Sequence, residues 1–320
     1  MDLTEQVTYG GPGWAQREGT LADEIARGEI WAPYACNSEW GRLRHVVLYC
    51  PGPDIQNIAC PNQELHLRPV RYRQLRRQFH GIRRAYQGAG VHVHCVPASG
   101  RDRRFPNLMF QRDLFWQTPA GAVVSRMASP VRSGEEQYAT RMLANLRVPI
   151  ALMINGTGLL EGSDLLWVSP KTVLCGVGRR TNESGQRQVA NLLETLDVEC
   201  RPVPLLKGGI QHLLGCVQVV SPDRALVRTE IASDRLLSEL SRLGLEIVSV
   251  SETDEVAERC ALNFAVLEPD RVIVADEVPV FRRFLGSLGI EIADAVPLSQ
   301  YGNAAGGLAC ATGILARDLS

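Results

Sequence analysis

The chain has 320 residues, of which 45% are hydrophobic and 22% charged, and its formal net charge is −1. This nearly neutral balance argues against nucleic acid as a partner, and no apolar run approaches the roughly 20 residues that span a bilayer. The first residues lack the basic start and apolar centre of a secretory signal, so we expect a cytoplasmic protein. Its nine cysteines form no CxxC pair, which argues against a zinc ribbon or a thioredoxin-like motif.

The chain opens on an extension and then begins a first strand–helix–strand unit. We interpret residues 1–35 as an N-terminal extension, in which "GGPGW" suggests a flexible tail or lid, and residues 36–320 as one catalytic domain. The apolar run at 42–52 predicts a strand. Side chains that step by three and four along 72–86 predict a helix, and 90–96 predicts the strand that follows it.

Four further units repeat this order, each beginning with a hairpin. Short apolar runs flank a proline turn at Pro119, Pro170, Pro222 and Pro269, and a Pro-Asp or Pro-Lys pair between such runs is typical of a hairpin. A helix follows each turn, with start signals at Ser133 with Glu136, at Asn182, at Ser233 and at Pro279. Strands are predicted next, at 147–153, 197–203, 244–250 and 289–295.

The repeat has a period of about 50 residues, which indicates an α/β array. Five such units close most simply into a ring, because an open array would leave sheet edges bare. The sequence therefore predicts an α/β fold with pseudo-fivefold repeats around a central channel.

Polar residues interrupt the repeat at an equivalent position in several units, just before or after an inner strand. We call this position the phase of the residue within its unit. Asp113 lies in "MFQRDLFW", Glu161 and Asp164 in "GTGLLEGSDLLW", His212 in "LKGGIQHLLGC" and Cys310 in "AAGGLACATGIL". Equal phase in a ring places these side chains at one end of the channel, so we expect them to converge.

The chemistry of this set points to a flat cationic substrate. A thiolate is a strong nucleophile, and a neighbouring histidine can stabilise it and move protons. Carboxylates attract a cation, and a carboxylate pairs especially well with a guanidinium. We therefore expect Cys310 to attack a guanidinium carbon that Asp113 holds.

These motifs resemble the guanidino-group-modifying enzymes of the pentein superfamily. "RD" before a strand, "EGSD", "QHLL", "GVGRRTNESG" and "GGLACATG" occur in the family order, from about residue 37 to the C-terminus. The superfamily holds arginine deiminases, dimethylarginine dimethylaminohydrolases and amidinotransferases. The resemblance implies a five-bladed α/β propeller and a covalent thiouronium intermediate on the cysteine.

The resemblance also implies a role for each site residue. Cys310 would be the nucleophile and His212 the general acid and base, with Asp113 gripping the guanidinium and Glu161 orienting the histidine. Two arginines, Arg132 and Arg180, would hold the substrate α-carboxylate. Leu214 stands where deiminases and amidinotransferases carry a second gripping acid, so this position would favour a substituted nitrogen. Arg112 stands where the dimethylaminohydrolases usually carry another acid.

The leading interpretation is a hydrolase of arginine or an N-substituted arginine that yields citrulline and ammonia or an alkylamine. Two alternatives are an amidinotransferase, which passes the amidino group to an amine acceptor, and a non-catalytic pentein-fold binding protein. We expect a small guanidino compound as partner, no cofactor, no metal, no nucleic acid and no membrane. A homodimer is a candidate assembly.

Two clusters outside this set favour ordinary explanations. His92 and His94 share one strand face, with Cys95 on the other, but the sequence offers no third metal ligand, so a surface strand is the simpler interpretation. Residues 67–104 carry ten arginines and one acid, Asp102. The apolar stripe of the predicted helix accounts for the tyrosines, and arginines would cover its exposed face.

Overall fold

The computed structural model describes residues 2–98, 100, 104–204 and 210–320. Its strands form five separate three-stranded sheets, and we name these blades A to E. From the inner to the outer strand they are A, β15 (Gly313–Arg317), β1 (Leu43–Cys50) and β2 (His92–Pro97); B, β3 (Phe115–Thr118), β4 (Gly121–Val124) and β5 (Ile150–Met153); C, β6 (Leu165–Ser169), β7 (Thr172–Val177) and β8 (Glu199–Pro204); D, β9 (Val217–Ser221), β10 (Arg224–Val227) and β11 (Glu246–Ser249); E, β12 (Ala265–Glu268), β13 (Arg271–Ala275) and β14 (Glu291–Val296).

Every blade combines an antiparallel inner pair with a parallel outer pair. The parallel pair requires a crossover, and one long helix supplies it in each blade: α2 (Tyr72–Gly88), α4 (Glu135–Asn145), α5 (Glu183–Glu194), α6 (Asp234–Arg242) and α8 (Pro279–Ser287). Inner strands are almost wholly buried and outer strands are half exposed. The predicted five-bladed α/β propeller is therefore confirmed.

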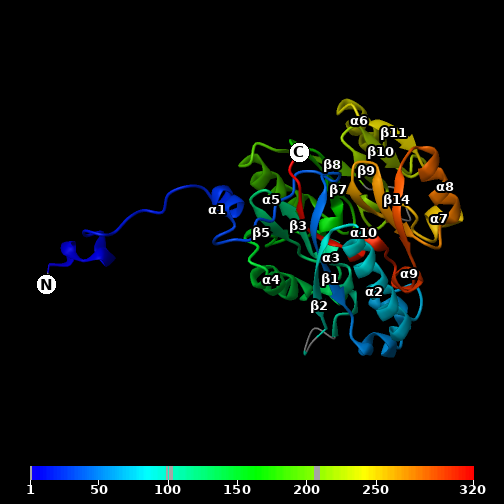
Figure 1. The fold of residues 1–320 in the computed structure, drawn as a ribbon, viewed down its shortest axis with the longest axis horizontal. Helices are drawn as coiled ribbons and strands as arrows, with labels where there is room; N and C mark the ends of the chain where they lie inside the picture. The colour runs from blue at the N-terminus through cyan, green and yellow to red at the C-terminus, as the bar shows by residue number, and fades with distance from the viewer. Residues whose placement is uncertain (1, 99, 101–103, 205–209) are drawn as a thin grey trace.

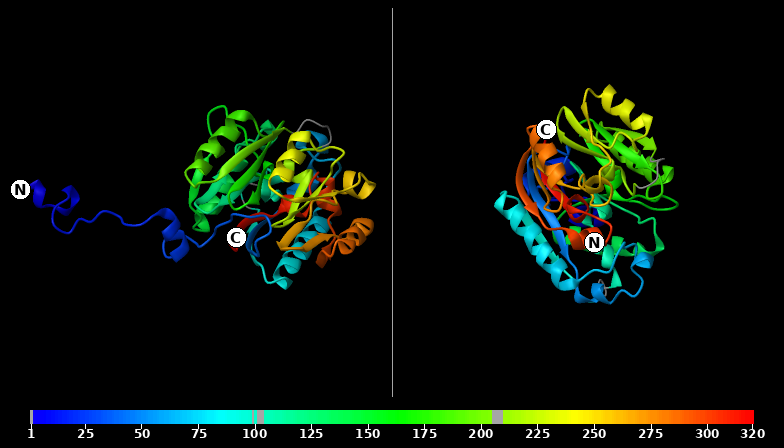
Figure 2. Two further views of the ribbon diagram at one scale, coloured as in Figure 1. Left: turned by 90° about the horizontal axis from the view of Figure 1, so that it is seen from above. Right: turned by 90° about the vertical axis from the view of Figure 1, so that its right-hand side faces the viewer.

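The ring closes through the end of the chain. β15 pairs antiparallel with β1, so blade A is built from both ends of the domain. Figures 1 and 2 show this C-terminal stretch in the middle of the molecule, with the helices towards the outside. Buried Arg317 supports the closure by donating hydrogen bonds to the carbonyl oxygens of Gly41 and Val266.

Three of the four predicted helix starts are confirmed. Asn182 accepts a hydrogen bond from the amide of Gly185, Ser233 accepts one from Leu236, and Pro279 is in the first turn of α8. The capping box at Ser133 is wrong. Gly134 stands before α4 with a φ of 107°, and the Glu136 carboxylate accepts hydrogen bonds from the amides of Met127 and Gly134 instead.

The N-terminal residues lead away from the propeller (Figure 1). They contain two short 3-10 turns, η1 (Leu3–Glu5) and η2 (Val7–Tyr9), and the helix α1 (Leu21–Arg27). Contact with the body begins before residue 36, because Arg147 donates hydrogen bonds to the carbonyl oxygens of Gly28 and Ile30 and accepts one from the amide of Ala32. The domain boundary at 36 stays a prediction.

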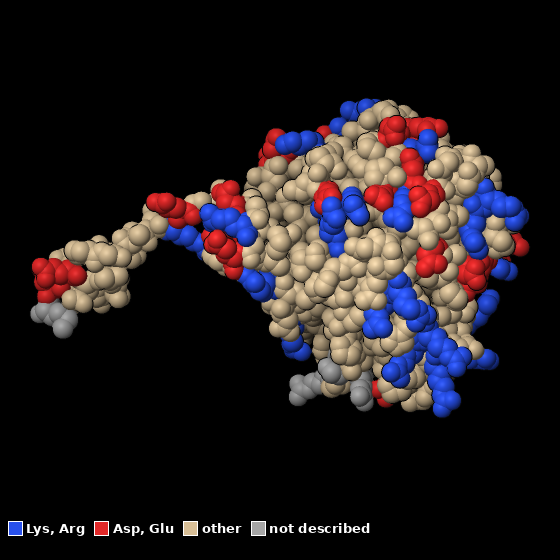
Figure 3. Space-filling view, viewed as in Figure 1, with Lys and Arg blue, Asp and Glu red and all other residues tan. Residues whose placement is uncertain are grey.

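The arginine-rich segment forms α2 and β2 over its described part. Leu75, Phe79, Ile82 and Tyr86 are buried on one face of α2, and basic side chains gather over the other (Figure 3). Asp102 lies outside the described residues. Within the described part of the chain, no helix is both long and apolar enough to span a membrane.

Candidate active site

The four predicted catalytic residues all stand just before an inner strand. Asp113 is in α3 (Gln111–Leu114), which leads into β3, and Cys310 is in α10 (Leu308–Ala311), which leads into β15. Glu161 and His212 are the residues before the 3-10 turns η8 (Gly162–Asp164) and η9 (Leu213–Gly215), which lead into β6 and β9. The structure brings the set together, because Asp113, His212 and Cys310 line one cavity and Glu161 is hydrogen-bonded to His212.

Glycines allow the site elements to approach one another. A Cβ at Gly162 would lie 2.5 Å from the carbonyl oxygen of Arg112, so η8 can rest on α3 only without a side chain there. A Cβ at Gly307 would lie 2.8 Å from the Cβ of Asn263, at the turn that presents Cys310. The glycine pair predicted before His212 is at 208–209 and lies outside the described residues.

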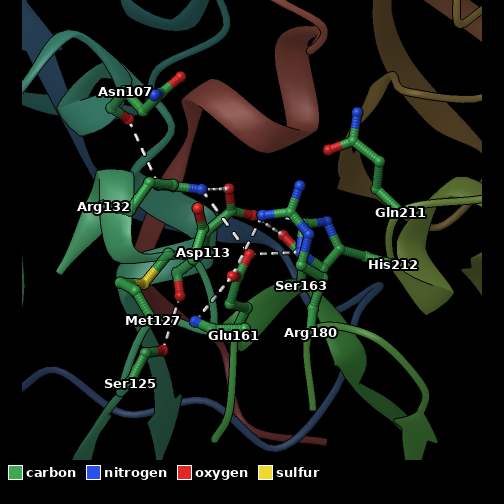
Figure 4. Close-up of polar contacts among 12 residues, drawn as sticks. Asn107, Asp113, Ser125, Met127, Arg132, Glu161, Ser163, Arg180, Gln211 and His212 are labelled. Carbon is green, nitrogen blue, oxygen red and sulfur yellow. Dashed lines mark hydrogen bonds and ion pairs between the residues drawn. The ribbon is translucent and has the colours of Figure 1, made fainter. Parts of the chain in front are cut away.

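His212 is held between two carboxylates (Figure 4). Its Nε2 is 2.7 Å from Oε2 of Glu161, and its Nδ1 is 3.8 Å from Oδ1 of Asp113. An ionised carboxylate only accepts hydrogen bonds, so Nε2 carries the proton towards Glu161. Nδ1 then remains as the ring atom on the Asp113 side.

Asp113 is fixed by two donors that leave no freedom to its carboxylate. The hydroxyl of Ser163 donates to its Oδ1 at 2.5 Å, and Nη1 of Arg132 donates to its Oδ2 at 2.7 Å. Arg112 does not pair with its neighbour Asp113, because it donates to Glu39 at 2.8 Å.

Arg132 does not have the free guanidinium that its implied role requires. Besides Asp113, its nitrogens contact Glu135 at 2.9 Å and lie 3.7 Å from Glu161, and its side chain is only 4% exposed. Three carboxylates therefore surround it and raise its pKa, against the effect of burial. Arg132 lines the cavity, but as a counterion of the gripping carboxylate, so holding the substrate α-carboxylate would require it to break these pairs.

Arg180 is the more available of the two predicted arginines. It lines the same cavity, and its side chain is 17% exposed. Its Nη1 lies 3.3 Å from Oε1 of Glu161. This contact does not occupy the other two guanidinium nitrogens. Its neighbour Arg179 is exposed, as expected if only Arg180 points to the site.

The buried charges set opposite protonation states on His212 and Glu161. Burial lowers the pKa of His212, but Asp113, the hydrogen bond with Glu161 and Asp164 outweigh it and raise that pKa to about 9. Burial acts to raise the pKa of Glu161, but the hydrogen bond from His212 and the charges of Arg132 and Arg180 bring it down to about 2. His212 is therefore an imidazolium at neutral pH, and Glu161 is its carboxylate partner.

Cys310 has a different environment. Burial and the charge of Asp113 raise the pKa of its thiol to about 12, against a hydrogen bond from Asn263. Nδ2 of Asn263 donates to the Cys310 sulfur at 2.8 Å, and Oδ1 of Asn263 accepts from the Cys310 amide at 3.0 Å. The side-chain amide of Asn263 thus both positions Cys310 and donates a hydrogen bond to its sulfur.

Three contributing residues were not predicted as site residues: Glu135, Ser163 and Asn263. Asn263 could have been found, because it stands two residues before β12 and so occupies in blade E the phase of the other site residues. The pairing of Glu135 with Arg132 depends on tertiary packing, and no sequence signal indicates it. Asp164 has a structural role, since it accepts hydrogen bonds from Thr181 and from the amide of Leu213.

Leu214 is buried next to the reactive groups. It lines a second cavity together with His212, Asn263 and Cys310. This placement agrees with the expectation that an apolar side chain replaces an acid near the substrate nitrogens.

Among the residues that the structure describes, two clusters have the atoms to hold a metal ion. Asp113, Glu161 and His212 form one, but Arg132 and Arg180 already place positive charge on both carboxylates. The second is His45 with His92 and His94. The interpretation that these two strand histidines have no third ligand is wrong, because the parallel register of β1 and β2 sets His45 opposite His92.

Comparison with known proteins agrees with this site. Residues 103–199 match the family model for arginine deiminase. The chain is 24% identical to the N(G),N(G)-dimethylarginine dimethylaminohydrolase of Pseudomonas aeruginosa over 268 residues, which cover 84% of this chain and 98% of that protein. With the five-bladed fold and the order of the motifs, these matches support a guanidino-group-modifying enzyme of the pentein superfamily.

Solved structures of two relatives have the same fold. The Pseudomonas aeruginosa dimethylarginine dimethylaminohydrolase in complex with citrulline superposes with a TM-score of 0.69 at 23% identity, over 85% of this chain and 98% of that one. The N-terminal domain of ArgZ, a cyanobacterial arginine dihydrolase bound to its substrate, has a TM-score of 0.72 at 16% identity, over 85% and 98% of the two chains.

Proposed function

We propose that this protein hydrolyses arginine or an N-substituted arginine to citrulline and ammonia or an alkylamine. The observation that carries the proposal is the Glu161–His212 pair, which faces Asp113 in the cavity that Cys310 also lines. A cation-binding carboxylate, a proton donor and a nucleophile thus share one pocket. The Pseudomonas aeruginosa relative is named as a hydrolase of dimethylarginine, which carries the guanidinium that such a pocket would bind.

Substrate binding replaces the Arg132 guanidinium on Asp113 by the guanidinium of the substrate. Asp113 grips the substrate guanidinium through the oxygen that Arg132 now occupies, so Arg132 must yield part of this contact. Arg180, which is partly exposed, binds the substrate α-carboxylate. Bidentate pairing between guanidinium and carboxylate at both ends then fixes the orientation of the guanidinium carbon.

The first half-reaction forms a bond between sulfur and carbon. The cationic guanidinium favours the thiolate of Cys310. The thiol proton passes to solvent as the substrate binds, and the thiolate attacks the central carbon. The imidazolium of His212 donates its proton to the departing nitrogen, and the C–N bond breaks. Ammonia or an alkylamine leaves, and a positively charged thiouronium remains on Cys310 beside a neutral His212.

The second half-reaction returns the enzyme to its starting state. Neutral His212 takes a proton from water as the water oxygen attacks the thiouronium carbon. The C–S bond then breaks, citrulline leaves, and the Cys310 thiolate and the His212 imidazolium are restored. The remaining proton of the water goes to the released amine. Glu161 keeps the imidazole oriented through both steps, and neither step requires a cofactor.

Leu214 favours a substituted nitrogen over a bare one. It is 2% exposed and offers no hydrogen-bond acceptor, so an unsubstituted terminal nitrogen gains nothing from it, whereas a methyl group on that nitrogen finds apolar contact. We therefore propose N-methylated arginines as the preferred substrate class. The cytoplasmic location and the homodimer stay predictions.

A product assay tests the proposed function. The purified protein is incubated with arginine, mono- and dimethylated arginines and agmatine, each with and without an added amine acceptor, and the products are identified by mass spectrometry. We expect citrulline and the matching amine from arginine and its methylated forms, unchanged by the acceptor, and no product from the Cys310→Ser variant. An amidino group on the acceptor, ornithine in place of citrulline, or turnover by Cys310→Ser would contradict the proposal.

A further inference from the structure

Three histidines gather on blade A, outside the catalytic cavities. His92 and His94 alternate on β2 and so project from one face, and His45 on β1 stands opposite His92 in the parallel register. Their ring centroids are 4.5 Å apart for His92 and His94, 5.1 Å for His45 and His92, and 5.7 Å for His45 and His94. None of the three lines the cavities of Cys310.

The ring nitrogens are near the spacing that a metal ion requires. One nitrogen from each histidine lies within 4.8 Å of the other two, and Nδ1 of His45 is 3.4 Å from Nε2 of His94. In a tetrahedral site with zinc–nitrogen bonds of about 2.0–2.1 Å, two ligand nitrogens stand about 3.3–3.4 Å apart. Two ligands are thus already in place.

The third ligand is free to join them. His92 is exposed, and within residues 2–98, 100, 104–204 and 210–320 it makes no hydrogen bond, only ring contacts with His45 and His94. A rotation of its exposed side chain is therefore enough to complete the set.

Tyr34 supplies a fourth polar group at this position. Its hydroxyl is 3.1 Å from Nε2 of His94, and its own backbone is anchored because Gln117 donates a hydrogen bond to its carbonyl oxygen at 2.8 Å. A buried phenol beside the ligand nitrogen can hydrogen-bond to a water molecule in the open coordination position.

The positive charge next to His45 in the chain is paired with a carboxylate. Arg44 is the neighbour of His45 in the chain, but it forms a double hydrogen bond to Asp318 at 2.7 Å for each contact. The cluster itself contains no carboxylate, which disfavours the hard cations Mg²⁺ and Ca²⁺ and leaves those that prefer imidazole.

We propose that His45, His92 and His94 bind a divalent cation of the zinc class, which ties the outer strand β2 to the middle strand β1. Three neutral imidazoles with a water in the fourth position are a common donor set for Zn²⁺. This site is independent of the proposed catalytic reaction, so its test can fail without affecting that proposal.

Zinc titration of the full-length protein tests the site. Chelator-treated protein competes for zinc with a chromophoric chelator at neutral pH. We expect one tightly bound zinc ion per protein chain. His92→Ala should weaken binding more than about 100-fold, beyond the 10–100-fold typical of an outer-shell partner, and Tyr34→Phe about 10-fold. His80→Ala on α2 removes a histidine outside both metal-capable clusters and is the matched control, with unchanged affinity.

A second measurement separates this site from the catalytic thiol. Cobalt(II) alone is added to the wild-type protein, and the absorption spectrum should lack the charge-transfer band of a thiolate ligand. Zinc stoichiometry should also be unchanged in Cys310→Ser. The proposal is overturned if His92→Ala binds zinc as the wild type does, if Cys310→Ser abolishes binding, or if wild-type protein binds no equivalent.

Discussion

The two halves of the active site hold their charges differently. On the half built by blades B, C and D, Asp113 meets Arg132, and Glu161 meets both His212 and Arg180. On the half built by blade E and the C-terminus, the Cys310 sulfur accepts a hydrogen bond from the neutral amide of Asn263. In the first half the pKa of His212 is raised to about 9, whereas in the second half burial raises the pKa of Cys310 to about 12.

This difference explains how an unreactive thiol can become a nucleophile at the right moment. The proton donor is charged before the substrate arrives, because its counterions belong to the protein. The nucleophile has no such counterion, so its negative charge is stabilised only when the substrate brings a cation next to it.

Removing the Asp113 carboxylate, which is proposed to bind the substrate guanidinium, should have the largest effect on kcat/KM. Asp113→Asn keeps the shape but removes the anion that would pair with the substrate guanidinium, and loss of one partner of a buried ion pair costs about 3–5 kcal/mol. We expect kcat/KM to fall about 10³-fold, measured by citrulline formation. The matched control is Asp270→Asn, which removes a surface partner of Arg224 and should leave activity unchanged. Equal activity of Asp113→Asn and wild type would remove Asp113 from substrate binding.

Neutralising Glu161 should shift the pH dependence of the reaction. The general acid must be protonated, so wild-type activity falls as the pH rises through the His212 pKa of about 9. Glu161→Gln removes an anion that raises this pKa, so the descending limb should move to lower pH by about one unit or more. The measurement is the pH profile of kcat/KM, and an unmoved limb would contradict the orienting and charging role of Glu161.

Weakening the neutral half should slow the nucleophile without affecting substrate affinity. Asn263→Ala removes the hydrogen bond to the Cys310 sulfur, and we expect kcat to fall about 10-fold to 100-fold with little change in KM, as for loss of a charge-assisted hydrogen bond. Alkylation of Cys310 by iodoacetamide in the presence of a guanidino ligand should slow in parallel. Faster alkylation in the variant would show that Asn263 does not stabilise the thiolate.

Adding an acid where the two halves meet should alter selectivity with the smallest effect on rate. Leu214→Asp provides an acceptor for a bare guanidinium nitrogen, and we expect the ratio of kcat/KM for arginine over dimethylarginine to rise about 10-fold. Leu214→Asn keeps a similar size without the charge and separates electrostatics from loss of apolar contact. An unchanged ratio in both variants would exclude Leu214 from substrate choice.

Much of the fold was predictable because local signals repeat in it. Proline turns between apolar runs marked the hairpins, and helix starts at Asn182, Ser233 and Pro279 were confirmed. The start at Ser133 was wrong because Gly134, with a positive φ, is the N-cap and α4 begins at Glu135. The spacing of a capping motif does not reveal the backbone angles of the residues between.

The convergence of the site was predictable for the same reason, and its internal pairing was not. Equal phase before each inner strand brought Asp113, His212 and Cys310 to one cavity. Whether Arg132 points to solvent or to Asp113 depends on how the turn that carries Arg132 packs against α3. The spacing of residues along the chain does not encode this packing. His45 likewise joins His92 and His94 only through strand register.

The most direct test of the account is to find the covalent intermediate on the thiol. The protein is mixed with N-methylated arginine, quenched in acid during turnover, digested and analysed by mass spectrometry. We predict a thiouronium adduct on the peptide that contains Cys310, increased in amount when Glu161→Gln slows its hydrolysis. A quenched enzyme that forms citrulline but carries no adduct on Cys310, or carries it on another cysteine, would contradict the account.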